Sequence, residues 1–366
     1  MPSVLVVVCD RRRTGTVILS AKTFMKMNPT KIFTLVALLS VGVAGCKKEI
    51  DPVPELPKTL TEEIVKRPNL TILNAALLKT GLADTLKANR LLTVFAPNDT
   101  AFQALLPPFN TVAGITGLAA TDPKVAELTA ILRYHILANA IPTTSLQTGL
   151  DANRSLTLQG KTDYVYLSKT SGMITINGAR VREGNRPASN GYIHTIDRVN
   201  MPPTGNVVQV VAGSADFNLL AAALAKTGLD NNLKAAGPFT VFAPTDEAFV
   251  AALRSLTGNS TLDESAALNF INTQLNSGST PSLATLTNVL LYHVASGRFY
   301  SPAIAAANLA SLPTLNASKT IVLTTASGTV TVTGANNGGQ AANLKNPDIH
   351  ATNGVIHAID RVLLPL

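Results

Sequence analysis

One ten-residue stretch occurs twice in this sequence. It reads TVFAPNDTAF at residues 93–102 and TVFAPTDEAF at residues 240–249, with eight identical positions at an offset of 147. Three other blocks recur in the same order: KTGL at 79–82 and 226–229, the Tyr-His pairs at 134–135 and 292–293, and NG-x-IH-x-IDRV at 190–199 and 353–362. The chain therefore carries a tandem duplication of a domain-sized unit, since solenoid repeats are much shorter.

Within the first copy, helical patterns come first and strand patterns last. Apolar residues at helical spacing predict helices over 70–80 and 125–135, with a short strand over 93–96 between them. Runs of β-branched residues separated by turn residues then predict strands over 155–158, 164–168, 173–176 and 192–199. This segregation favours an α+β fold over a parallel α/β layout.

The repeated blocks together resemble the fasciclin, or FAS1, domain. The resemblance covers residues 59–204 and 205–366, and the break falls at the short connection 202–205. It implies two tandem domains, each a twisted antiparallel β-wedge or sandwich packed with a helical bundle. It also implies extracellular adhesion or ligand binding, generally without catalysis.

The second copy is not identical to the first. Residues 257–283 form an insert rich in Ser, Thr, Asn and Gly, and extra residues occur near 336–348. Leu268, Ile271 and Leu275 lie at helical spacing and predict a short helix within the insert. We therefore expect the two copies to present different surfaces.

Residues 27–45 have the pattern of a secretory signal. Lys31 precedes an apolar run that is too short for a stable membrane-spanning helix. The following VAGC at 43–46 resembles a bacterial lipobox, which implies lipidation of Cys46. A plain signal peptide with a chance cysteine is the competing interpretation. Residues 1–26 fit no signal pattern, and we interpret them as translation from an upstream start codon, with a cytoplasmic extension as the alternative.

Residues 46–58 predict an extended tether. Three prolines favour a polyproline conformation, which at about 3.1 Å per residue reaches roughly 40 Å. The charged residues directly after Cys46 resemble the surface-export signal of some Gram-negative lipoproteins. We expect a lipid-anchored protein of the outer membrane, at the cell surface or alternatively facing the periplasm.

Composition and charge exclude several classes of protein. The chain is 46% hydrophobic, so wholesale disorder is excluded, and no stretch of about 20 apolar residues follows position 45, which excludes a polytopic membrane protein. Cys9 and Cys46 are too few for a disulfide scaffold or a thiolate metal cage. The net charge of +8 comes mostly from the first 45 residues, and no DNA- or RNA-binding motif accompanies it, so we expect no nucleic-acid partner.

The closing blocks place a histidine and an aspartate on one predicted strand in each copy. His194 and Asp197, like His357 and Asp360, are three residues apart and face opposite sides of a strand, so neither pair forms a hydrolytic relay. The chain has no G-x-S-x-G, no H-E-x-x-H and no Cys/His cluster. We expect no enzyme, no metal and no cofactor, and a structural role for these four residues.

The Tyr134-His135 and Tyr292-His293 pairs have two interpretations. In some animal relatives the region around this pair is implicated in integrin contact, so the resemblance makes these four residues candidates for binding. Alternatively, each imidazole is a partly buried group that holds a helix end to the sheet. Asp99 and Asp246 follow the repeated strand, where helix starts leave unpaired N–H groups, so we expect a capping role for them.

Charge differs between the copies. Residues 59–204 hold 14 basic and 10 acidic residues, whereas residues 205–366 hold 7 and 8. The excess in the first copy includes Arg180, Arg182 and Arg186, and the first two share one face of a predicted strand. These arginines form either a site for an anionic polysaccharide or acidic protein, or a solvated strand edge that resists aggregation.

Together these patterns predict a non-catalytic, lipid-anchored adhesion or matrix-binding protein of the cell surface. Its expected partner is an extracellular matrix protein or polysaccharide, and it meets the membrane through its lipid anchor. The alternative is an accessory glycan-binding lipoprotein of an outer-membrane uptake system.

Overall fold

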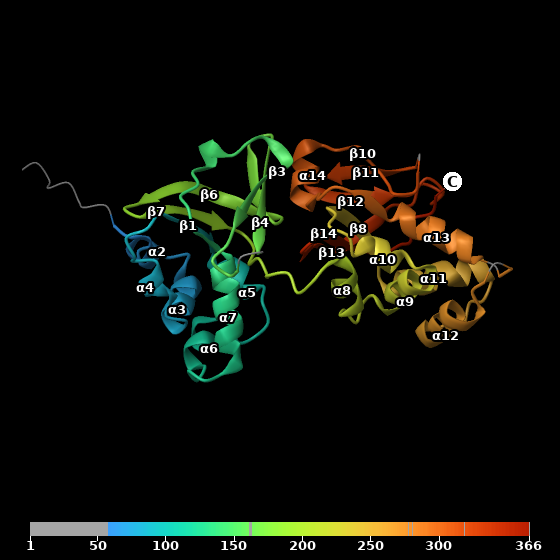
Figure 1. Cartoon of the computed structure of the whole chain (residues 1–366), viewed down its shortest axis with the longest axis horizontal. Coiled ribbons are helices and arrows are strands. Elements are labelled where there is room, and N and C mark those ends of the chain that lie inside the picture. Colours follow the sequence, from blue (N-terminus) through green and yellow to red (C-terminus); the bar gives the residue numbers. More distant parts are fainter. Residues whose placement is uncertain (1–57, 161–162, 277, 280, 318, 366) are drawn as a thin grey trace, which may run out of the picture. The chain divides into compact units, whose positions relative to one another are not determined.

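The computed structural model describes residues 58–160, 163–276, 278–279, 281–317 and 319–365. The leader, Cys46 and the tether as far as residue 57 lie outside the described residues. Pro57–Leu366 form one compact unit that contains both copies. Each copy consists of a group of helices and a curled sheet (Figure 1).

The first copy begins with helices and ends with strands, as the sequence predicts. Its helices are α2 (Leu60–Val65), α3 (Thr71–Lys79), α4 (Leu82–Thr85), α5 (Asp99–Gln103), α6 (Val112–Gly117), α7 (Pro123–Tyr134) and the 3₁₀ turn η2 (Thr143–Ser145). Its strands are β1 (Leu92–Pro97), β2 (Ile136–Leu137), β3 (Gly149–Leu156), β4 (Tyr164–Thr170), β5 (Met173–Ile176), β6 (Ala179–Ala188) and β7 (Gly191–Ile196).

The second copy repeats this plan with one additional helical element. Its helices are α8 (Val207–Ala212), α9 (Asn218–Thr227), α10 (Leu229–Leu233), α11 (Asp246–Thr257), α12 (Glu264–Asn269), the π-helical turn η3 (Phe270–Gln274), α13 (Leu283–Tyr292) and α14 (Ser301–Ala307). Its strands are β8 (Phe239–Pro244), β9 (Val294–Ser296), β10 (Ser311–Pro313), β11 (Thr320–Ala326), β12 (Thr329–Thr333), β13 (Ala342–Ala351) and β14 (Gly354–Ile359). The helix predicted in the insert is confirmed as α12 and η3, with Ile271 and Leu275 buried.

Each copy has a seven-stranded sheet, ordered β2-β1-β7-β6-β5-β4-β3 in the first and β10-β11-β12-β13-β14-β8-β9 in the second. The neighbours are antiparallel except for β1–β7 and β14–β8, which are parallel. The predicted α+β class is therefore confirmed, but the sheet is mixed rather than wholly antiparallel. The parallel pair joins the first and last strands of each copy, so the whole intervening chain serves as the long connection that such a pair requires.

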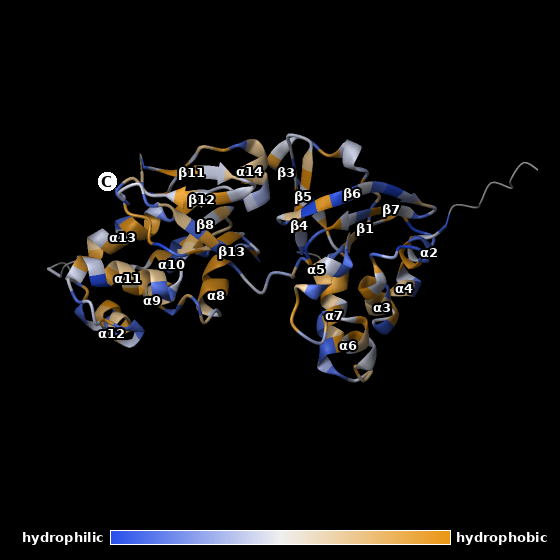
Figure 2. Cartoon of the chain, turned by 180° about the vertical axis from the view of Figure 1, so that it is seen from behind, coloured by the Kyte–Doolittle hydropathy of each residue, from blue (hydrophilic) through white to orange (hydrophobic). Residues whose placement is uncertain are grey.

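The central strands are buried on both faces, and this explains their continuous apolar sequence. All six residues of β1 are buried. Val94 and Ala96 pack against the helices, whereas Phe95 joins a second cluster inside the curl of the sheet. Hydropathy colouring shows many apolar residues along the helices, most clearly in α8, while β6 carries hydrophilic stretches (Figure 2). The core of the first copy is thus divided into two clusters, one on each face of the sheet, and the arginines lie on the more exposed strand β6.

Candidate functional site

The Tyr-His pair of the first copy is buried and structural. Nδ1 of His135 lies 2.8 Å from the carbonyl oxygen of Ile131, one turn earlier in α7, and its Nε2 accepts a 2.9 Å hydrogen bond from the N–H of Asn200. The imidazole thus ties the end of α7 to the segment after β7. Tyr134 donates its hydroxyl to the carbonyl of Tyr164 at 2.9 Å and has no exposed surface.

The second copy repeats these contacts. His293 bridges the carbonyl of Val289 and the N–H of Leu363, and the hydroxyl of Tyr292 donates to the carbonyl of Thr320. Burial lowers the pKa of both His135 and His293 to about 4, so both imidazoles are neutral near pH 7. All four side chains of the two Tyr-His pairs are buried, as the interpretation of a group that holds a helix end to the sheet expects.

The strand histidine of the first copy, His194, also bonds to backbone groups and not to a catalytic partner. Nδ1 of His194 accepts from the N–H of Asn185 at 3.0 Å, and its Nε2 lies 2.8 Å from the carbonyl of Ile141. Asp197, on the other side, accepts from the N–H of Arg180 and from the Arg182 side chain. In this arrangement the histidine and the aspartate do not converge.

The corresponding histidine of the second copy approaches an aspartate that sequence spacing did not single out. Nδ1 of His357 accepts from the N–H of Asp348 at 3.1 Å, and its Nε2 lies 2.8 Å from the carbonyl of Phe299. Burial lowers the pKa of His357, although the nearby Asp348 carboxylate opposes this. Asp360 instead binds Asn343 on β13.

The motif aspartates cap helices, but not the helices that follow them. Asn98 and Thr245 cap those helices, α5 and α11. The carboxylate of Asp246 accepts from the N–H groups of Asn218 and Leu219 at the start of α9. That helix begins without a cap of its own.

Asp99 has the same role toward α3. It accepts from the N–H of Ile72 at 2.9 Å and from the hydroxyl of Thr71 at 2.8 Å. Both aspartates thus bind the start of a neighbouring helix.

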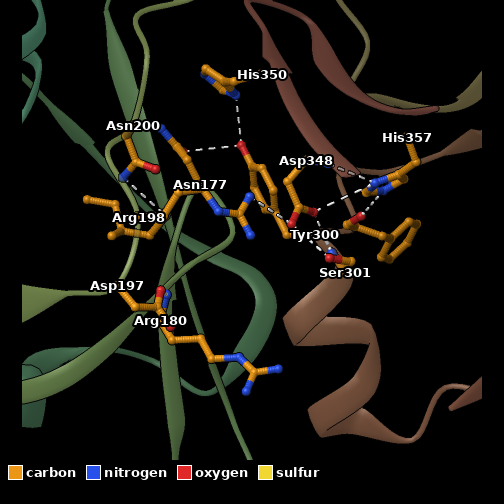
Figure 3. Close-up of polar contacts among 12 residues, drawn as sticks. Asn177, Arg180, Asp197, Arg198, Asn200, Tyr300, Ser301, Asp348, His350 and His357 are labelled. Atoms are coloured by element: carbon orange, nitrogen blue, oxygen red, sulfur yellow. Dashed lines mark hydrogen bonds and ion pairs between the residues drawn. The ribbon is translucent and has the colours of Figure 1, made fainter. Parts of the chain in front are cut away.

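A polar cluster joins the two copies, and Figure 3 shows its centre at the Tyr300 side chain. The hydroxyl of Tyr300 donates to Oδ1 of Asn177 at 3.2 Å and lies 2.8 Å from Nδ1 of His350. Asn177 also donates to the Tyr134 hydroxyl at 2.8 Å. Burial, assisted by the positive charge of Arg298, lowers the pKa of His350 to about 3 and keeps it neutral.

A buried carboxylate forms the second part of this junction. Asp348 has no exposed side-chain surface and accepts from both the N–H and the hydroxyl of Ser301, at 2.6 and 2.7 Å. Arg198 of the first copy donates to Oδ2 of Asp348 at 3.1 Å. A methyl group added at Gly178 would lie 2.7 Å from Cγ of the same aspartate, so a glycine is needed at this point of contact.

The third part is a stacked arginine. The guanidinium carbon of Arg298 lies 3.6 Å from the centre of the Tyr166 ring, which belongs to β4 of the first copy. Arg298 is only 3% exposed and donates to the carbonyl of Thr352. Cation–π contacts strengthen when the cation is desolvated, as it is here.

The structure separates the three arginines of the predicted anion site. Arg180 and Arg182 line one cavity of about 290 Å³, together with Arg198. Arg186 lies outside it and forms an ion pair with Glu183 at 2.8 Å. The cause is a pair of irregularities in β6, between residues 181 and 183 and between 183 and 186, which break the simple alternation of faces.

The family model for the fasciclin domain matches the chain twice, at residues 68–202 and 215–365. The chain belongs to the fasciclin-domain family. Fasciclin-domain proteins are generally non-enzymatic adhesion proteins, and a tandem pair of such domains is consistent with that kind of function.

Relatives with fasciclin domains come from animals and bacteria. The chain is 30% identical over 273 residues to the transforming growth factor-beta-induced protein ig-h3 of Oryctolagus cuniculus, covering 75% of this chain and 34% of the relative. It is 32% identical over 159 residues to protein sll1483 of a Synechocystis strain, covering 43% of this chain and 73% of the relative. Human periostin is 30% identical over 195 residues, which is 53% of this chain and 20% of periostin.

This chain spans only about a third of the length of the ig-h3 proteins that it matches. Among solved structures, it is similar to a FAS1 domain pair from the insect cell adhesion molecule Fasciclin I. That match has a TM-score of 0.39 and 18% identity, and it covers 83% of this chain and 95% of the other.

The residues at the junction between the two fasciclin domains were missed by sequence reasoning. Asn177, Tyr300, Asp348 and His350 lie outside the repeated blocks, so a search for repetition passes over them. The dipeptide Asn177-Gly178 is a signal for a two-residue hairpin turn, and it does connect β5 to β6. That signal predicts the turn but not what the turn packs against.

The described part of these fasciclin domains contains neither a metal-binding cluster nor a membrane-spanning helix. Within that part, no group of three His, Cys, Asp or Glu side chains is arranged to hold a metal ion. None of its helices has the length and apolar character needed to cross a membrane.

Proposed function

We propose that this chain is a lipid-anchored adhesion protein of the cell surface, whose two fasciclin domains bind an extracellular matrix component without catalysing a reaction. The observation that carries the proposal is the use of the motif side chains. His135, His194, His293 and His357 each bond to two backbone groups, and all four are buried. Exposed charged side chains are therefore the groups available for binding, and this arrangement favours adhesion over catalysis.

The anchor is the second part of the proposal. The lipobox-like sequence ending at Cys46 supports lipidation, and acyl chains contribute about 0.8 kcal/mol per buried CH₂ toward membrane binding. Cells fed a fatty-acid probe should label the protein, while Cys46→Ser should remain unlabelled and leave the membrane fraction. Equal labelling of both proteins would contradict the anchor.

Adhesion is tested on whole cells. Cells that display the protein should attach to surfaces coated with matrix proteins or polysaccharides more strongly than cells that lack it. Cells producing Cys46→Ser should lose this attachment, since the protein is no longer held at the surface. Unchanged attachment after deletion of the protein would contradict the proposed function.

One observation favours the alternative, an accessory glycan-binding lipoprotein of an outer-membrane uptake system. The arginine-lined cavity is a compact polar hollow, of the size that takes one small group rather than a flat protein surface. If uptake is the function, deletion of the protein should slow growth on an acidic polysaccharide and leave surface attachment unchanged.

A further inference from the structure

The arginine-lined cavity lies where the two fasciclin domains meet. The first domain contributes Arg180, Arg182 and Arg198 to its wall, and the second contributes Ser301, Thr329 and Pro347. The cavity is complete only when both domains are present. It measures about 290 Å³, near the lower end of the range for small-molecule sites.

Two of the three arginines already have ion-pair partners. Arg182 binds Asp197 at 2.7 Å, and Arg198 binds the buried Asp348 at 3.1 Å. Arg180 is half-buried, and the described residues offer its guanidinium no ion pair. Figure 3 shows this guanidinium extended away from Asp197 and Arg198.

The backbone fixes the position of this unpaired guanidinium. The N–H of Arg180 donates to Oδ1 of Asp197 at 2.8 Å, and the N–H of Asp197 donates to the carbonyl of Arg180. The start of the side chain is therefore held, while its planar end is available. A guanidinium in this state pairs with a carboxylate through two parallel hydrogen bonds.

The strands around the cavity argue against an extended peptide as the ligand. β6 is paired with β5 and β7, β12 with β11 and β13, and β13 also with β14. At the cavity itself, Arg180 pairs with Thr175 of β5 and Thr329 pairs with Ala326 of β11. An added strand is blocked on those sides of the two residues, which favours side-chain recognition of a compact anionic group.

We propose that this cavity binds the carboxylate of one uronic acid unit in an acidic polysaccharide. Arg180 pairs with the carboxylate, because Asp197 and Asp348 already neutralise the charges of Arg182 and Arg198. Thr329 and Pro347 of the second domain line the same cavity, and their side chains supply one polar and one apolar group for a sugar ring. This inference rests on the proposed binding function and names the class of ligand.

The test measures affinity of the purified protein, in mild detergent, for an oligogalacturonate. Arg180→Met keeps much of the side-chain stem and removes the charge, and it should weaken binding about 10- to 100-fold, as expected for hydrogen bonds to a charged group. Arg186→Met is the matched control: it removes the same charge from the same strand but lies outside the cavity, and it should change affinity less than threefold. Arg180→Lys keeps the charge without the planar fork and should fall between wild type and Arg180→Met.

Four further ligands make the result decisive. Neutral dextran should not bind, and free glucuronate should compete with the oligogalacturonate on the wild-type protein, a readout that needs no variant. Equal losses in Arg180→Met and Arg186→Met would overturn the proposal in favour of diffuse charge attraction. Dextran sulfate or poly-glutamate that binds as tightly as oligogalacturonate, with the same dependence on Arg180, would overturn the assignment to uronate.

Failure of this site can be distinguished from failure of the proposed function. If wild-type protein does not bind oligogalacturonate but its cells still attach to matrix, the cavity proposal fails and adhesion stands. If binding depends on Arg180 but deletion leaves attachment unchanged, the cavity stands and adhesion fails.

Discussion

The two fasciclin domains share one backbone frame but place different side chains at equivalent points. In the first domain, Oδ1 of Asn185 accepts from the N–H of Thr143 at 2.6 Å; in the second, Oδ1 of Asp348 accepts from the N–H of Ser301, also at 2.6 Å. Both acceptors have a left-handed backbone, with φ of 58° and 66°. The amide serves one domain only, whereas the carboxylate also binds Arg198 of the other domain.

At three other points of the junction, the second domain also has a polar side chain that the first domain lacks. The bonds of His194 to Ile141 and of His357 to Phe299 are equivalent, so they align the two domains residue by residue. In that alignment, Arg298, Tyr300 and His350 of the second domain stand where the first has Ala140, Pro142 and Pro187. The second domain therefore carries polar side chains on the face that meets the first domain, and the first domain lacks them at the corresponding points.

The hairpin turns differ in a complementary way. β5 and β6 of the first domain are joined by the two residues Asn177-Gly178, and both contact the second domain. The equivalent connection in the second domain, between β12 and β13, spans residues 334–341. Two copies of one fold can therefore keep the same core and still have different roles at their contact. The short turn of the first domain meets the polar face of the second.

Acidification should produce the largest effect. Burial lowers the pKa of His135 and His293 to about 4 and that of His350 to about 3, whereas the unfolded chain binds protons near 6.5. Stability is therefore fully present above about pH 6.5 and is lost as the pH falls toward 4, at about 1.4 kcal/mol per pH unit for each group. Chemical denaturation should show about 2 kcal/mol lost at pH 5 for each of His135 and His293.

A histidine variant assigns part of that loss to the junction. His350→Gln removes a titrating group that only the second domain has, so the stability of this variant should fall less steeply below pH 5. Unfolding free energies that do not change between pH 7 and 5 would contradict the buried, neutral state of these histidines.

Removal of the bridging carboxylate should have the next largest effect. Asp348→Ala leaves Arg198 and the two donors of Ser301 without their acceptor, and we expect a loss of about 3 kcal/mol. The matched change, Asn185→Ala, has a similar backbone but no contact across the junction and should cost about 1 kcal/mol.

Asp348→Asn isolates the contribution between the domains. It copies the first domain by keeping an acceptor for Ser301 and removing the charge that meets Arg198. Its denaturation midpoint should lie between those of wild type and Asp348→Ala. Equal stabilities of Asp348→Ala and Asn185→Ala would show that the ion pair contributes nothing to the folded state.

The fold could be predicted from the sequence because its main determinants are local and repeated. The TVFAP stretch and the closing NG-x-IH block are the two strands of the parallel pair in each sheet, so their recurrence marks the centre of each domain. The capping role of Asp99 and Asp246 was predicted from position alone. Which helix each aspartate caps depends on packing between helices, and no local pattern encodes that.

The arginine-lined cavity was predicted less completely, because it depends on contacts between residues far apart in the sequence. Arg180 and Arg182 were found from charge, but Arg186 leaves their group because irregularities in β6 shift its face. Arg198 follows β7 and was not singled out, since only the folded sheet and the second domain bring it to the cavity. Residues that contact each other across the two domains are far apart in the sequence, and the alternation of residues along one strand does not predict such contacts.

A glycine substitution tests the close approach of the two domains. Gly178 and Gly172 have nearly equal backbone angles, with φ of 82° and 81°, but only a methyl group at Gly178 meets Asp348. Gly172→Ala should cost about 1 kcal/mol for the left-handed backbone. Gly178→Ala adds the steric conflict and should cost about 2 kcal/mol or more in chemical denaturation. Equal losses would mean that the turn does not pack closely on the second domain.

The smallest effect should come from the helix caps, where the two domains are most alike. Asp246 accepts from two backbone N–H groups and is 7% exposed, whereas Asp99 accepts from one N–H and one hydroxyl and is more exposed. Replacement of either by alanine should cost about 1 kcal/mol, which for a domain of this size lowers the melting temperature by roughly 2–4 °C, with Asp246→Ala the larger of the two. Oligogalacturonate binding should not change in either variant, because neither aspartate lines the arginine cavity. Reduced binding at an unchanged melting temperature would instead place these aspartates in the ligand site.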